Sequence, residues 1–153
     1  MANRRTRQLP LIDCHEVSSV ATPQAVFDAL WHATSSAFDG PITTLYGRAM
    51  GTQPSYVEAT KRPTAGTSKL VGFEVCSVEE PCRLQLVGRH RFSVYTHTFD
   101  IEPDGAGSRL RATTHAAFPG LLGRVYRTAV IDTRLHVFVM RRMIAIAARR
   151  AEL

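Results

Sequence analysis

The stretch YTHTFDIEPDGAGSRLRATTHAAF, from Tyr95 to Phe118, alternates apolar with polar or charged residues on both sides of a turn at Pro103–Gly107. Successive side chains of a strand point to opposite faces, so this alternation predicts two antiparallel strands joined by the turn. One face of this hairpin is charged and should meet water. The other face is mainly apolar and carries Tyr95, His97, Phe99, Ile101, Leu110, Ala112, Thr114, Ala116 and Phe118.

A long helix is predicted directly after the hairpin. Beyond Pro119 and Gly120, apolar residues recur at helical spacing from Leu121 to about Arg150. One straight helix of this length would span roughly 45 Å at 1.5 Å per residue. Its stripe needs an apolar surface, which the inner face of the sheet supplies. The stripe consists of Leu122, Val125, Tyr126, Ala129, Thr133, His136, Met140, Met143, Ile144 and Ala147.

The first part of the chain predicts one strand and one helix. The strand is expected over Ile12–Val20. A helix should follow from Pro23 to about Ala33, because Thr22 suits the N-cap and proline suits the first helical position.

The middle of the chain predicts more strands and one poorly defined segment. Residues 70–78 and 83–92 read as strands joined by short turns, which implies an antiparallel meander. Residues 35–67 are punctuated by glycine and proline and show two short β-prone pieces, at 42–46 and 56–60.

Length and composition favour one domain, expected at 11–153 after a basic, mobile arm at 1–10. The net charge of +6 permits attraction to an anionic partner but says nothing about the fold. No apolar run approaches the ~18 residues of a membrane span, and no secretory signal pattern follows the basic arm. We therefore expect a cytoplasmic protein without integral membrane association. The three cysteines lack zinc-site or disulfide spacing, and no metal or cofactor is expected.

Three motifs resemble a known superfamily: ATPQAVFDALW at 21–31, VEEPCRL at 78–84 and GSRLRATT at 107–114. Together with the final helix, they resemble the START-related helix-grip proteins, also called SRPBCC. The segment from Leu70 onward is most similar to bacterial members grouped with polyketide cyclases, dehydrases and lipid-transport proteins. The resemblance implies an α+β fold in which a curved antiparallel sheet of about seven strands wraps a long C-terminal helix. It also implies two short helices after strand one and a cavity between sheet and helix.

Such a cavity would bind a small hydrophobic molecule, such as a lipid, an isoprenoid or a polyketide-like compound. Small residues and methionine on the facing surfaces favour this interpretation, because they leave space or adapt to an irregular ligand. The alternative is that the same residues are ordinary core packing. The predicted lining residues are Phe73, Tyr95, His97, Phe99, Thr114, Ala116, Phe118, Tyr126, Ala129, Thr133, His136 and Met140.

His97 and His136 are the candidate catalytic residues, since an imidazole can transfer a proton to or from a bound carbonyl or enol. Asp132 lies four residues before His136 and could orient its ring; alternatively the two form an exposed helix pair. His97 could equally be a core histidine bonded to a neighbour. Asp13 and His15 belong to a run of polar residues that alternate sides of a strand and cannot all converge.

Three functions follow from these features. The first is binding or carriage of a hydrophobic ligand, and the second is a cyclase or dehydratase that uses a cavity histidine. The third and weakest is an interaction module that uses the arginine-rich helix to meet a protein or nucleic acid. Nucleic acid is disfavoured, because arginines spaced by seven residues usually form a solvated helix face. Homodimerisation through the sheet edge stays open.

Overall fold

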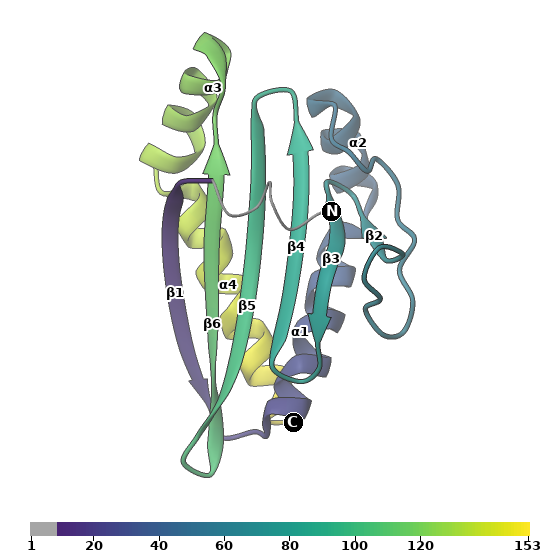
Figure 1. The fold of residues 1–153 in the computed structure, drawn as a ribbon, viewed down its shortest axis with the longest axis vertical. Coiled ribbons are helices and arrows are strands. Elements are labelled where there is room, and N and C mark those ends of the chain that lie inside the picture. Colours follow the sequence, from purple (N-terminus) through teal and green to yellow (C-terminus); the bar gives the residue numbers. More distant parts are fainter. Residues whose placement is uncertain (1–8) are drawn as a thin grey trace.

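The computed structural model describes residues 9–153, so most of the arm expected at 1–10 lies outside the described residues. The chain forms one antiparallel sheet with helices packed on one of its faces (Figure 1). The elements in chain order are β1 (Leu11–Ser19), α1 (Pro23–Phe38), α2 (Pro41–Met50), β2 (Lys69–Leu70), β3 (Phe73–Glu79), β4 (Arg83–His90), β5 (Ser93–Asp104), β6 (Gly107–Ala117), α3 (Gly120–Arg127), the π-helical segment η3 (Thr128–Asp132) and α4 (Leu135–Ala151).

The sheet has six strands in the order β1-β6-β5-β4-β3-β2. Strands β2 to β6 follow one another as the expected meander, and β1 pairs with β6 at the far side. Helices α1 and α4 pack against each other and lie behind the same face of the sheet (Figure 1). The predicted fold class is confirmed, with six strands in place of about seven.

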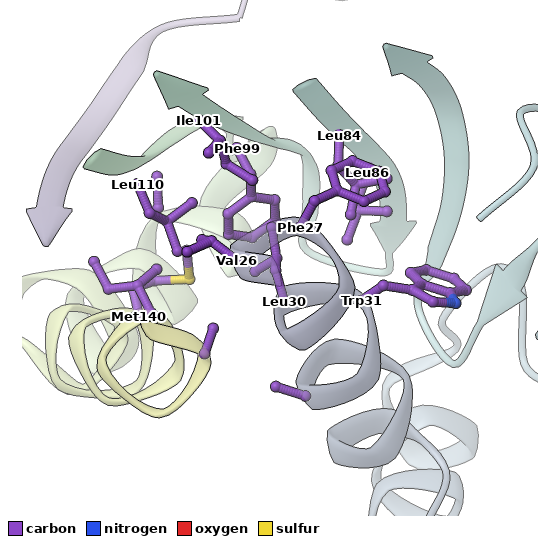
Figure 2. Packing of buried hydrophobic residues seen from close by; sticks show 14 of the residues in the cluster. Val26, Phe27, Leu30, Trp31, Leu84, Leu86, Phe99, Ile101, Leu110 and Met140 are labelled. Carbon is purple, nitrogen blue, oxygen red and sulfur yellow. The ribbon is translucent and has the colours of Figure 1, made fainter. Parts of the chain in front are cut away.

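The core lies where α1 and α4 meet the middle of the sheet. Figure 2 shows Val26, Phe27 and Leu30 of α1 directed toward the strands, with Met140 of α4 beside them. Phe99 is 1% exposed, which confirms the face predicted from alternation in the hairpin. Each fully buried side chain of this size contributes about 1.5–3 kcal/mol to the free energy of unfolding.

The start of α1 agrees with its sequence signals, but its length does not. The Thr22 hydroxyl accepts a hydrogen bond from the Ala25 amide at 3.3 Å, and Pro23 is the first helical residue. The helix ends at Phe38, beyond the expected Ala33. Thr34, at 0% exposure, belongs to its buried face, so tertiary packing extends the helix past the sequence signal.

The β-prone pieces at 42–46 and 56–60 were the least accurate predictions. The first lies within α2, which Pro41 begins and Gly51 ends in a left-handed conformation with φ 64°. Proline at the first position and glycine after the last are helix-boundary signals that outweigh the β-propensity of a short apolar run. The second contributes only an isolated bridge, between Glu58 and Lys69.

The final helix is broken, so the prediction of one continuous helix is wrong. The π-helical segment η3 separates α3 from α4, and Arg134 then adopts a left-handed conformation with φ 62°. The sequence TAVIDT at 128–133 is rich in β-branched residues, which have low helix propensity. Thr133 also donates a hydrogen bond to the Ala129 carbonyl at 2.6 Å, a contact that bends helices.

Of the helices among residues 9–153, none combines the length and the apolarity needed to cross a membrane.

Candidate functional site

A pocket of about 190 Å³ opens at the end of the sheet where α2 and α3 lie. Strands β5 and β6 form its floor, and α2, α3, η3 and the start of α4 form its sides. It sits beside the core of Figure 2 rather than within it. Its walls are mainly apolar and aromatic, and a few polar groups point into it, which is typical of a small-molecule site.

Two histidines and a threonine are linked along one wall of the pocket. His97 of β5 and Thr114 of β6 are cross-strand partners, and Nδ1 of His97 lies 3.1 Å from the Thr114 hydroxyl oxygen. Nε2 of His136, from the first turn of α4, lies 3.2 Å from the same oxygen. The two imidazole rings are stacked with their centres 5.7 Å apart.

A carboxylate from the first strand extends this series of side-chain contacts. Asp13 of β1 is the register partner of Thr114 on the side opposite His97. Its Oδ2 atom lies 3.4 Å from Nε2 of His136 and 3.4 Å from Nε2 of His15. Among the described residues, neither oxygen of Asp13 meets hydrogen-bond geometry, although both are buried. Buried carboxylate oxygens without full hydrogen bonding are uncommon and often mark functional sites.

The charges of these groups differ because of their surroundings. Burial lowers the pKa of His97 to about 3, and His136 adds to this shift while Asp13 opposes it. His97 is therefore neutral near pH ~7. Burial acts to raise the pKa of Asp13, but the nearby His136, Thr114 and His15 outweigh it and hold the pKa below its ordinary value. Asp13 is therefore an anion, and it stands at one end of the series of contacts that runs through His136 and Thr114 to His97.

These charges indicate which side chain donates each hydrogen bond between His136, Thr114 and His97. The Thr114 hydroxyl has one proton and can donate it to only one imidazole, so the other ring must donate to its oxygen. The Asp13 carboxylate favours a proton on the facing Nε2 of His136. Thr114 then donates to Nδ1 of His97. A neutral His97 carries its proton on Nε2, where it can be donated to a ligand in the pocket.

Tyrosines shape the other side of the pocket. The Tyr95 hydroxyl donates to the Gly72 carbonyl at 2.8 Å, and burial raises its pKa, so it stays protonated. This close approach requires glycine at residue 88, because a Cβ there would lie 1.8 Å from the Gly72 carbonyl oxygen. Tyr46 of α2 and Tyr126 of α3 pair their hydroxyls at 3.2 Å and so bridge the two helices.

Several solved structures resemble this chain over most of its length. A protein from Rhizobium leguminosarum is 15% identical with a TM-score of 0.56, over 92% of this chain and 93% of that one. Protein CV1439 from Chromobacterium violaceum is 11% identical with a TM-score of 0.54, over 94% and 99%. Ara h 8.0201 is 11% identical with a TM-score of 0.51, over 91% and 95%. No protein-family model matches the chain, and no curated protein matches it in sequence.

The chain has the helix-grip fold. At these identities the structural similarity establishes the fold and leaves the function to be argued from the site. The helix-grip domain differs from the sequence expectation in one respect that matters here. Two helices, α3 and α4, stand where one long helix was expected. Residues of α3, η3 and the start of α4 line the pocket.

Eight of the twelve residues predicted to line a cavity lie on the wall of the helix-grip pocket. They come from β3, β5, β6, α3 and α4, or follow β6 directly. Their role in ligand binding stays a prediction. These residues are Phe73, Tyr95, His97, Thr114, Ala116, Phe118, Tyr126 and His136.

The other four predicted residues lie elsewhere. Phe99 and Met140 are buried in the core below the pocket. Ala129 and Thr133 are exposed, so the expectation that they face the cavity is wrong. Leu122 and Val125, which precede η3 in the same predicted stripe, are exposed as well, so the stripe already leaves the sheet in α3 before the π-helical segment begins. Asp132 is exposed in the same segment, and Asp13 is the carboxylate that approaches His136.

Sequence reasoning missed Asp13, Tyr46 and His90, all of which lie in or beside the site. Asp13 and His15 do share one face of β1, as period two requires, and this was the available signal. His90 packs its ring 4.7 Å from that of Tyr126, and burial lowers its pKa. Within residues 9–153, no group of three or more His, Cys, Asp or Glu side chains is placed to hold a metal ion.

Proposed function

We propose that this protein binds a small, mainly apolar molecule that carries at least one polar oxygen. The observation that supports this most directly is the pocket of about 190 Å³, with mainly apolar walls and His97 among its few polar lining residues. An apolar cavity of about 150 Å³ accommodates benzene, and drug-sized ligands occupy about 300–1,000 Å³. The size therefore favours an aromatic compound of one or two rings, or a short isoprenoid, over a long-chain lipid.

Binding can be tested with 1-naphthol, a two-ring compound with one hydroxyl. We expect calorimetry to give a Kd below about 100 µM, corresponding to a free energy of about −5.5 kcal/mol. Tetradecanoic acid, which is too long for the described pocket, should bind more weakly. Native mass spectrometry of the purified protein should also be examined for a bound molecule of similar size. Absence of both a bound molecule and 1-naphthol binding would overturn the proposal.

A second candidate function is proton transfer to the bound ligand, favoured by the chain from Asp13 through His136 and Thr114 to His97. Nε2 of His97 would protonate a ligand carbonyl oxygen while water removes the proton from the adjacent carbon, which forms an enol. Nδ1 of His97 would take the Thr114 proton, and Thr114 would regain one from His136. The step requires His136 in its protonated form, which gives up one proton beside the Asp13 carboxylate and becomes neutral.

This second function predicts catalysed enolisation of 1-tetralone, a two-ring ketone. Deuterium exchange at the carbon next to its carbonyl should be accelerated by the wild-type protein. Thr114→Val removes the connecting hydroxyl at nearly constant volume and should reduce the acceleration by about 10²-fold, in the range of general acid–base catalysis. Thr113→Val on the outer face of the same strand is the matched control. Equal exchange rates for wild type and Thr114→Val would show that the side-chain series from Asp13 to His97 takes no part in the reaction.

A further inference from the structure

Five large aliphatic side chains on the two helices beside the pocket are exposed. Ile42 and Leu45 belong to α2, and Leu121, Leu122 and Val125 belong to α3. They are between 62% and 83% exposed, well above the exposure of an ordinary packed apolar residue. We call these five residues the apolar rim. An exposed apolar cluster next to a binding site commonly marks an interaction surface.

The two helices bring the apolar rim to the mouth of the pocket. Each helix has an inner side that lines the pocket, carrying Tyr46 on α2 and Tyr126 on α3. The hydroxyls of these tyrosines lie 3.2 Å apart, so the helices meet at this point. Figure 1 shows α2 and α3 at the same end of the sheet. Ile42 and Leu122 lie one helical turn before Tyr46 and Tyr126, so exposed apolar residues continue the tyrosine-bearing faces of both helices beyond their contact.

The charges carried by α2 and α3 themselves all have one sign. Arg48 of α2 and Arg124 and Arg127 of α3 are the charged residues of these two helices, and neither helix contains an acidic residue. A solvated helix face usually mixes both signs. Aliphatic side chains together with arginine on short helices are instead typical of segments that lie in the interface of an anionic membrane.

We propose that the apolar rim docks the mouth of the pocket onto the surface of an anionic lipid bilayer. This inference rests on the proposed binding function, because small apolar ligands partition into bilayers and would reach the pocket directly from there. A second copy of the chain fits the surface less well. A symmetric contact through the rim would bring the arginines of α2 and α3 from both copies into one interface, where these helices offer no acidic residue to pair with them.

Vesicle flotation tests the docking. Wild-type protein should float with vesicles of about 70% phosphatidylcholine and 30% phosphatidylglycerol, and much less with pure phosphatidylcholine. The bound fraction should fall when salt is raised from about 0.1 M to about 1 M. Leu121→Ser with Leu122→Ser should weaken binding at least about tenfold. Val20→Ser, an exposed residue in the loop after β1 at the other end of the sheet, is the matched control and should bind like wild type.

Three outcomes would overturn the docking proposal: wild type that does not float, a Leu121→Ser/Leu122→Ser variant that floats like wild type, or a wild-type dimer that this variant dissociates. The last would show that a second copy covers the rim. The 1-naphthol titration separates this proposal from the binding function, because no rim residue lines the pocket. If the double variant binds 1-naphthol normally but no longer floats, docking is supported. If wild type floats but binds no 1-naphthol, the binding function alone fails.

Discussion

Replacing Ala116 with phenylalanine is expected to reduce the affinity for 1-naphthol by at least about 100-fold, or about 2.7 kcal/mol. Ala116 lies on the pocket wall opposite Tyr95 in the β5–β6 register and is 4% exposed. A phenyl ring at this position would occupy space that the ligand needs. The pocket can take up the added ring, so we expect the free energy of unfolding to change by less than about 1.5 kcal/mol. Calorimetric titration and urea unfolding measure the two quantities.

The matched control for this variant is Ala117→Phe. Ala117 is the next residue of β6, so its side chain points to the other face of the sheet. Its replacement adds the same ring outside the pocket and should leave the affinity for 1-naphthol unchanged. If Ala116→Phe is folded and binds 1-naphthol as tightly as wild type, the ligand does not occupy this pocket.

The hairpin could be predicted from the sequence because its information is local. Alternation over Tyr95–Phe118 places His97 and Thr114 on the same face, and the short turn makes them neighbours. The same reasoning could not place Asp13 beside Thr114. Their pairing joins strands about a hundred residues apart in the chain, and its register depends on the assembled sheet and not on any local pattern.

The helical part of the site was harder to predict because it departs from regular geometry. A stripe counted at 3.6 residues per turn from Leu121 assumes a continuous helix, and it placed Ala129 and Thr133 on the pocket side. The stripe already leaves the sheet in α3, where Leu122 and Val125 are exposed, and the left-handed Arg134 then gives α4 a new phase. His136 and Met140 still face the sheet because α4 restarts after the break. Val130 and Ile131 of η3 line the pocket together with His136 of α4, so the irregular segment belongs to the candidate site.

Acid is expected to destabilise the wild-type protein more steeply than the His97→Gln variant. Burial lowers the pKa of His97 to about 3 in the folded protein, whereas an unfolded histidine titrates near 6.5. Between these values the unfolded chain binds a proton that the folded chain does not, so stability falls as pH falls. The slope approaches about 1.4 kcal/mol per pH unit from this residue alone. Glutamine does not titrate, so the variant should lose this dependence.

Urea unfolding at about pH 7, 5.5 and 4.5 measures the effect in the window where His97 dominates. Asp13 also makes the free energy of unfolding fall as pH falls, but at lower pH. Its pKa lies below the ordinary carboxyl value, and its contribution to stability is lost only as pH falls through that lower value. His115→Gln, which makes the same replacement on the outer face of β6, is the matched control. His97→Gln is expected to lose some stability at pH 7, since glutamine replaces a ring bonded to Thr114. The decisive quantity is therefore the change in unfolding free energy with pH. If this slope is the same for His97→Gln and wild type, burial does not hold His97 neutral.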